Sequence, residues 1–280
     1  MNNKKQLFKF FLSESILFSL TFFLGILGAT KSKKIFSLEK IEIPQISLFN
    51  FLLSFAIATL FVFFLTKFLK SSLIKGKIYK TLFVLTSLFS GTIFFEIFFG
   101  EPIALILMLF FVFWWLKKPN VLNQNLLMIF GISGICSILG LSFKPENLIL
   151  ILILLSIYDF LAVYKTRHMV EIAKGMIEQK IIFGFVIPPD FLSFGESVEK
   201  IEPGGKFLIL GGGDVAFPLL LSVSLIPFGI LKATIVSIFS LIGLFFSFLI
   251  FFFQKERKPI PALPPIAFFS IIGFLITSFI

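Results

Sequence analysis

The sequence predicts an all-α membrane protein with nine transmembrane helices, and three observations support this class. First, 58% of the 280 residues are hydrophobic, 14% are charged, and the mean hydropathy is +1.05, well above the range of soluble domains. Second, apolar runs of about 20 residues recur along the whole chain. Third, the basic residues lie in short clusters between these runs. A multi-pass protein of the cell membrane is therefore expected, with the lipid bilayer as its surroundings.

Nine apolar runs meet the length requirement for a transmembrane helix, which is about 20 residues, or fewer where neighbouring helices bury it. The first run follows a basic N-terminus, as in a signal peptide, but it continues to Ala29 without a convincing cleavage site and is interpreted as a span. The fourth run is short, and Gly100-Glu101-Pro102 before it predicts a tight turn. The expected spans cover approximately residues 7–29, 46–66, 80–99, 102–116, 122–141, 147–164, 207–227, 230–253 and 260–280.

The distribution of basic residues predicts the orientation of these spans. With nine spans, 19 of the 25 Lys and Arg residues fall on the side of the N-terminus and six fall on the opposite side. Because cytoplasmic loops are enriched in Lys and Arg, the N-terminus is expected in the cytoplasm and the C-terminus outside. The chain should form one integral membrane domain, with six helices in 1–164, a cytoplasmic loop in 165–206 and three helices in 207–280.

Composition also argues against several classes of partner and cofactor. The net charge is +10, but the basic residues form no continuous face, so no nucleic-acid partner is expected. Cys136 is the only cysteine and His168 the only histidine, which excludes an intrachain disulfide and a cysteine-based metal site. The sequence does not indicate an oligomeric state.

Two aspartates inside apolar runs are the candidate functional residues. Asp159 lies near the end of the sixth span and Asp214 near the start of the seventh, and an ionised carboxylate in hydrocarbon costs several kcal/mol. At about 1.5 Å per residue both lie roughly 9 to 12 Å from the cytoplasmic ends of their spans. Antiparallel neighbouring helices would bring them face to face, where they cannot both ionise and would share one proton. Such a pair can activate water as a general base and general acid.

Two unusual segments accompany these acids. Gly211-Gly212-Gly213 removes side chains from the seventh span just before Asp214 and would let the sixth span approach closely. Pro259-Ile-Pro261-Ala262-Leu263-Pro264-Pro265 opens the ninth span, also on the cytoplasmic side. Four prolines in seven residues exclude a regular helix and leave unpaired carbonyl groups, which a membrane protein tolerates only where protein or a water-lined cavity surrounds them.

Taken together, Tyr158-Asp159, Gly211-Gly-Gly213-Asp214 and Pro261-Ala262-Leu263 resemble the YD, GxGD and PAL motifs of the presenilin and signal peptide peptidase family. The three motifs fall in the family's order and on its sixth, seventh and ninth spans. The cytoplasmic N-terminus is similar to presenilin and opposite to signal peptide peptidase. The compact chain looks most like the archaeal members, and its loop is shorter than presenilin's, which argues against autoproteolytic maturation.

The resemblance implies an intramembrane aspartyl endopeptidase that hydrolyses peptide bonds within transmembrane segments of other proteins or within signal peptides. Asp159 and Asp214 would be the catalytic pair, and no metal or organic cofactor would take part. The implied substrate-binding residues surround this pair and are Tyr158, Gly211, Gly213, Pro261, Ala262 and Leu263.

Alternatives remain open at this stage. The main one is a proton-coupled membrane transporter that uses Asp159 and Asp214 as a proton relay, and another is a non-catalytic membrane scaffold. Gly131-Ile-Ser133-Gly134 matches the GxSG of rhomboid serine proteases, but His168 lies in a polar loop where it cannot serve as the base. A zinc protease would require an HExxH motif, which the sequence lacks. The remaining acids near spans, Glu14, Glu96 and Glu101, are expected at interfaces.

The segment 181–187 is rich in β-branched and aromatic residues and ends at Pro188-Pro189, which predicts an extended strand. A transmembrane substrate must unwind before hydrolysis, and its freed backbone groups then need partners. We therefore expect 181–187 to be mobile in the free enzyme and to pair with the unwound substrate next to Pro261-Ala262-Leu263. An apolar loop that rests on lipid headgroups is the alternative interpretation.

Overall fold

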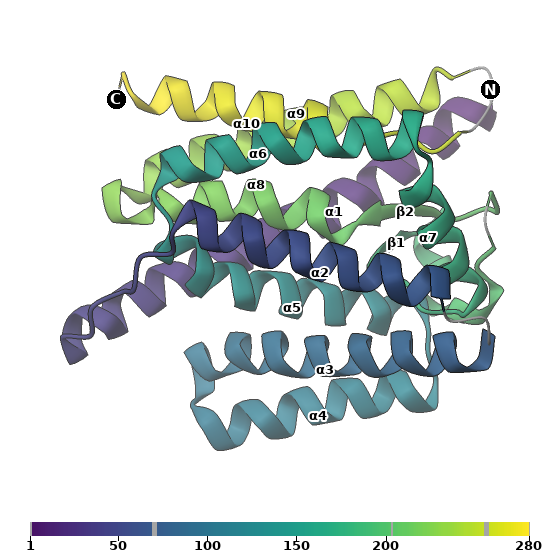
Figure 1. Cartoon of the computed structure of the whole chain (residues 1–280), viewed down its shortest axis with the longest axis horizontal. Coiled ribbons are helices and arrows are strands. Elements are labelled where there is room, and N and C mark those ends of the chain that lie inside the picture. The colour runs from purple at the N-terminus through teal and green to yellow at the C-terminus, as the bar shows by residue number, and fades with distance from the viewer. Residues whose placement is uncertain (1, 69–71, 203, 255–257, 280) are drawn as a thin grey trace.

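The computed structural model describes residues 2–68, 72–202, 204–254 and 258–279, and most of these residues are helical. The long helices run side by side as a bundle, with a small sheet at the end that carries the N-terminus (Figure 1). The elements are α1 (Asn2–Glu39), α2 (Leu48–Phe68), α3 (Ser72–Phe99), α4 (Glu101–Lys117), α5 (Val121–Leu139), α6 (Pro145–Phe160), α7 (His168–Glu178), β1 (Gly184–Ile187), β2 (Leu208–Gly211), α8 (Gly212–Ser224), α9 (Ile230–Phe252) and α10 (Leu263–Thr277).

Each of the nine apolar runs contains most or all of one helix in the described ranges. Five of these helices, namely α1, α3, α5, α6 and α9, contain segments long and apolar enough to cross a membrane, whereas α2, α8 and α10 contain shorter apolar segments. Helix α4 has 17 residues. The chain turns between α3 and α4 at Gly100, whose φ of 83° favours glycine. The predicted tight turn before the fourth span is therefore confirmed.

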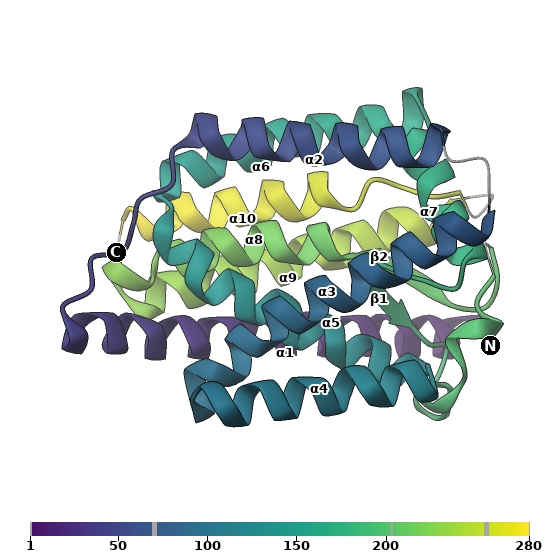
Figure 2. The ribbon, with the colours of Figure 1, turned by 60° about the horizontal axis from the view of Figure 1, so that its bottom comes forward.

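Helix α5 lies at the centre of the bundle. Its most apolar 18-residue window is 72% buried, against 33–44% for the corresponding windows of the other four long helices. Helices α3 and α4 lie along one side of α5, and α8 and α10 lie on the other (Figures 1 and 2). Gly134 permits the close approach of α3, because a Cβ at this position would lie 2.2 Å from the carbonyl oxygen of Ser90.

The strands β1 and β2 form a two-stranded antiparallel sheet in which Gly184 is opposite Gly211 and Ile187 is opposite Leu208. The expectation of helix from residue 207 is therefore wrong for 208–211, and the fold is not purely helical. A short apolar run such as Leu208-Ile-Leu210 fits a buried strand as well as a buried helix, so periodicity alone cannot separate them. Helix α8 begins only at Gly212.

The predicted loop 165–206 also contains regular structure. A π-helical turn at Leu161–Lys165 ends the sixth span, and α7 follows it. Residues 259–262 before α10 are not helical and α10 begins at Leu263, so the predicted effect of the proline-rich segment is confirmed while the helix start at 260 is wrong by three residues. The extended strand predicted in 181–187 is present as β1, but it is buried and paired with β2, so the expectation that this segment is mobile and awaits a substrate strand is wrong.

Candidate active site

The two candidate aspartates lie on neighbouring helices. Asp159 is in the last turn of α6, where its side chain is only 7% exposed. Asp214 is in the first turn of α8 and is half-buried. The carboxyl groups are close enough to interact electrostatically. Two neighbouring carboxylates repel each other when both are ionised, and this repulsion favours the state in which one of the two carries a proton.

The proline-rich segment reaches the first of these carboxyl groups. The backbone N–H of Leu263 donates a hydrogen bond of 3.4 Å to Oδ2 of Asp159. Leu263 begins α10, and the first N–H groups of a helix have no partner within the helix. Pro261 and Leu263 are buried, and Ala262 is half-buried. The non-helical entry to α10 therefore supplies a backbone donor to Asp159 from the chain's last apolar segment.

The hydroxyl group of Tyr158 bonds to the first residue of α7. Its oxygen shares a hydrogen bond of 2.9 Å with Nε2 of His168, and Nδ1 of His168 is 2.6 Å from the hydroxyl oxygen of Thr166. His168 is half-buried, and its contact with Tyr158 could not be predicted from the sequence. The π-helical turn folds this loop back against the end of α6, and no sequence pattern indicated that reversal.

Helix α2 covers one side of this region through Phe55. The ring of Phe55 meets the rings of Tyr158 and Phe217 edge-to-face, with centroid distances of 6.5 and 6.2 Å. Tyr158 adjoins the first aspartate in the sequence, and Phe217 follows the second by three residues on α8. One aromatic side chain thus bridges the two helices that carry the acids.

The three glycines before Asp214 are not equivalent. A Cβ on Gly211 would lie 2.9 Å from Oδ2 of Asp214, whereas a Cβ on Gly213 would lie 3.5 Å from its nearest neighbour, the ring of Phe217. Gly211 ends β2 and is not helical, so the expectation that all three glycines form one patch of a helix is wrong. Gly211 leaves space beside the Asp214 carboxyl group, and its backbone N–H donates toward that group.

The sheet next to Asp214 has one occupied edge. The Val186 N–H donates to Oδ1 of Asn125 at 2.8 Å, and Nδ2 of Asn125 donates to the Val186 carbonyl oxygen at 2.7 Å. Val186 therefore directs both backbone groups away from β2. In an antiparallel ladder its opposite residue, Ile209, must then direct its own groups away from β1. The N–H and C=O of Ile209 form the free edge of the sheet, and this edge leads to Asp214.

Glu14 is a residue that the sequence interpretation misplaced. It was expected at an interface, but its side chain is only 7% exposed, and its Oε2 has no hydrogen-bond partner among the described residues. Glu14 interacts electrostatically with Asp214 and shares a face of α1 with Phe18 and Thr21, both buried. Glu96 and Glu101 are exposed, as expected. Within the described ranges no three His, Cys, Asp or Glu side chains cluster as metal ligands would.

Comparison with known proteins adds to this geometry. Two solved structures, each titled as a presenilin family intramembrane aspartate protease and differing in crystal form, superpose on the chain with a TM-score of 0.63. The first shares 19% sequence identity, with 95% of each chain covered. The second shares 20%, with 94% of this chain and 95% of the solved chain covered. The bundle therefore has the fold of an intramembrane aspartate protease.

A family model described as signal-peptide peptidase, presenilin aspartyl protease matches residues 16–280. The match spans nearly the whole chain, and the chain belongs to this family. A search of curated protein sequences gives no match. The family model and the solved structures describe proteases, and neither supports the transporter alternative.

Proposed function

We propose that this protein is an intramembrane aspartyl endopeptidase of the cell membrane that cleaves peptide bonds within transmembrane segments of other proteins or within signal peptides. The observation that carries the proposal is the placement of Asp159 and Asp214 on two helices, α6 and α8, that pack against each other, with the Leu263 N–H bonded to the first acid. One shared proton gives the pair a base and an acid at the same time.

The proposed reaction uses one aspartate in its ionised form and the other in its protonated form. The ionised aspartate removes a proton from water while the water oxygen bonds to the carbonyl carbon, and the protonated aspartate gives its proton to the carbonyl oxygen. The resulting gem-diol collapses when a proton moves to the amide nitrogen and the C–N bond breaks, which leaves a carboxyl group and an amine. The Leu263 N–H keeps one oxygen of Asp159 in place during these transfers.

The experiment that tests this function is incubation of the purified protein with a single-span peptide in a bilayer. Mass spectrometry should find two fragments whose cut lies inside the apolar span, and in H₂¹⁸O the new carboxyl group should carry the heavy oxygen. Intact peptide after prolonged incubation, together with proton-coupled uptake by vesicles that contain the protein, would support the transporter reading instead.

We further propose that an unwound substrate pairs with β2 and not with β1. The outer edge of β1 is already occupied at Val186, whose N–H and C=O both bond to Asn125. Ile209 is 39% exposed, and among the residues that the structure describes its N–H and C=O have no hydrogen-bond partner, so they can pair with an added strand. Such a strand would run along β2 toward Asp214, which supports delivery of its peptide bond to the acids, with Pro261, Ala262, Leu263 and Tyr158 around it.

The glycine geometry gives a matched pair of variants. Gly211→Ala would force its methyl group within 2.9 Å of Oδ2 of Asp214, and a displacement of this kind at a reacting group can lower the rate by about 10²-fold. Gly213→Ala makes only ordinary contacts and should keep activity within a few-fold. Cleavage rates measured under subsaturating substrate compare the two, and equal rates would argue against the close packing of Gly211 on Asp214.

The proposed orientation has nine spans, a cytoplasmic N-terminus and an external C-terminus. The test places a cysteine at one exposed residue on each side of the membrane. The two positions are Glu199, in the loop before β2, and Phe279 near the C-terminus, which is 90% exposed. In intact cells an impermeant thiol reagent should label Phe279→Cys and leave Glu199→Cys unlabelled until the membrane is opened. The native Cys136 is buried and serves as the unlabelled background. The opposite pattern would reverse the orientation.

A further inference from the structure

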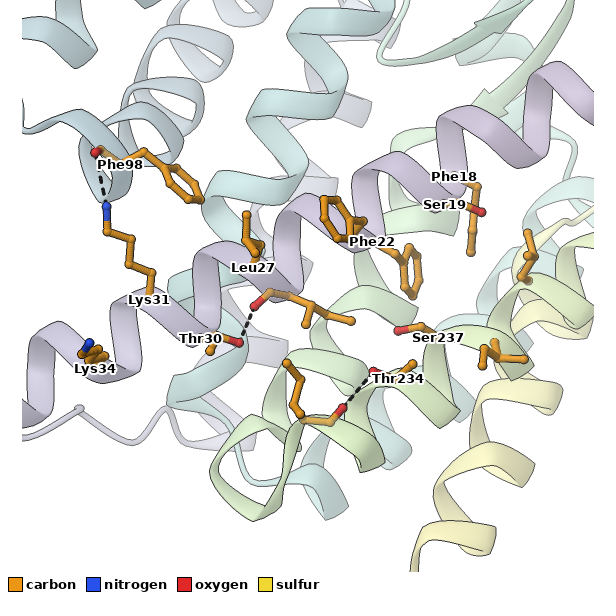
Figure 3. A pocket seen from close by; sticks show the side chains of 15 residues that line it. Phe18, Ser19, Phe22, Leu27, Thr30, Lys31, Lys34, Phe98, Thr234 and Ser237 are labelled. Atoms are coloured by element: carbon orange, nitrogen blue, oxygen red, sulfur yellow. Dashed lines mark hydrogen bonds between the residues drawn. The ribbon is translucent and has the colours of Figure 1, made fainter.

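A cavity of about 640 Å³ lies between α1 and α9, with the end of α3 at its rim. Phe18 marks one end of the groove, and Lys31 and Lys34 mark the other (Figure 3). None of its lining residues belongs to α2, α6 or α8, so it is separate from the candidate active site. Its volume is in the range of pockets that hold small molecules.

The wall of this groove is suited to hydrocarbon. Phenylalanine, leucine and isoleucine side chains make up most of it. Four hydroxyl side chains also line it, Ser19, Thr30, Thr234 and Ser237. Three of them already donate to a carbonyl oxygen of their own helix, Thr30 to Ile26, Thr234 to Ile230 and Ser237 to Ala233, at 2.8 to 2.9 Å. The wall therefore offers an incoming polar ligand few free donors below the lysines.

The rim of the groove is suited to an anion. The ammonium group of Lys31 donates to the Phe98 carbonyl oxygen at 3.2 Å and lies 5.0 Å from the Phe98 ring. In the part of the chain that the structure describes, the salt bridge found is Lys206 with Glu196, so neither Lys31 nor Lys34 is neutralised by a carboxylate. Two positive charges thus stand at one end of an apolar groove.

The length of the groove matches one leaflet of a bilayer. Sixteen residues of helix separate Phe18 from Lys34 and span about 24 Å at 1.5 Å per residue. Half of a bilayer, with its headgroup region, measures roughly 20 to 22 Å. Phe18 is at the middle of the predicted first span, 7–29, and the lysines lie just beyond its outer end. The groove thus runs from the midplane to the outer headgroup level.

We propose that this groove is a binding site for one anionic phospholipid of the outer leaflet. The phosphate group would lie against Lys31 and Lys34, and an acyl chain would follow α1 down to Phe18 between α1 and α9. This inference does not depend on the proteolytic function, because the groove shares no residue with the acids.

Native mass spectrometry of the full-length, delipidated protein tests the proposal with two probes, phosphatidylglycerol and phosphatidylcholine with the same acyl chains. Wild type should bind one phosphatidylglycerol in preference to phosphatidylcholine. The double variant Lys31→Gln, Lys34→Gln should bind phosphatidylglycerol about 30-fold more weakly, from roughly fivefold per lysine, while phosphatidylcholine binding should not change. Lys144→Gln, which removes an exposed lysine expected on the same side of the membrane but outside the groove, is the matched control and should bind as wild type does.

A second variant keeps the proposal testable if the lysine changes disturb folding. Ser237→Phe fills the groove from α9 and should reduce binding of phosphatidylglycerol while leaving both lysines in place. Equal binding of the two lipids by wild type would show only annular lipid and would overturn the proposal. Unchanged phosphatidylglycerol binding in both variants, or its displacement by a single-span peptide, would overturn it as well.

Discussion

Asp159→Asn and Asp214→Asn are each expected to lower peptide cleavage by about 10⁴-fold, the upper range for loss of a general acid or base. Asparagine keeps the size of the side chain and one carbonyl oxygen, so it can still accept the Leu263 N–H at position 159. It cannot carry the shared proton. The double variant should be no slower than either single variant, because the two acids act as one unit.

The measurement is the initial rate of fragment release from a single-span peptide, with thermal unfolding of each variant as the test of folding. Glu146→Gln is the matched control, because Glu146 is an exposed acid at the other end of α6. It should retain the wild-type rate. Cleavage at the wild-type rate by either aspartate variant would remove the basis for the proposed mechanism.

Ile209→Pro is expected to reduce kcat/KM by about 10²-fold or more while leaving the sheet intact. The Ile209 N–H points away from β1, so proline removes no bond of the β1–β2 ladder and is compatible with an edge position. It removes the donor offered to an added strand. A substrate carbonyl group left unpaired in hydrocarbon costs several kcal/mol, and about 1.4 kcal/mol corresponds to a factor of ten in rate.

Ile209→Val keeps the N–H and should cleave at nearly the wild-type rate. Leu210→Pro should instead lower the melting temperature. Leu210 is opposite Phe185 in the ladder, and proline at this position removes an N–H that bonds to β1. If Ile209→Pro cleaved as fast as Ile209→Val, strand addition to β2 would be excluded.

Much of the fold follows from apolar runs whose length the bilayer fixes, which is why every expected run contains a helix. The two acids could also be found from sequence, since a carboxylate among apolar residues is rare and costly. The two-stranded sheet could not be predicted from the sequence. Leu208-Ile-Leu210 carries no period that separates strand from helix, and β1 and β2 are separated by the 20 residues 188–207.

The residues that sequence reasoning missed depend on contacts between distant segments. Asn125 lies in the apolar run of α5 and gives no sign that its amide will complete the edge of a strand 61 positions away. Glu14 is in the first half of a long helix, and its burial follows from how α1 packs in the bundle. His168 meets Tyr158 only because the π-helical turn redirects the chain.

The hydrogen bonds between Asn125 and both backbone groups of Val186 also bear on the turnover rate of the proposed protease. With one edge closed, the sheet accepts a single extended chain, and a cleaved chain keeps the same main-chain bonds as an intact one. Under the proposed strand addition, a fragment that stays on β2 would compete with the next substrate, and its departure would limit the steady-state rate once chemistry is fast. Progress curves should slow as fragments accumulate, and short extended peptides should act as competitive inhibitors.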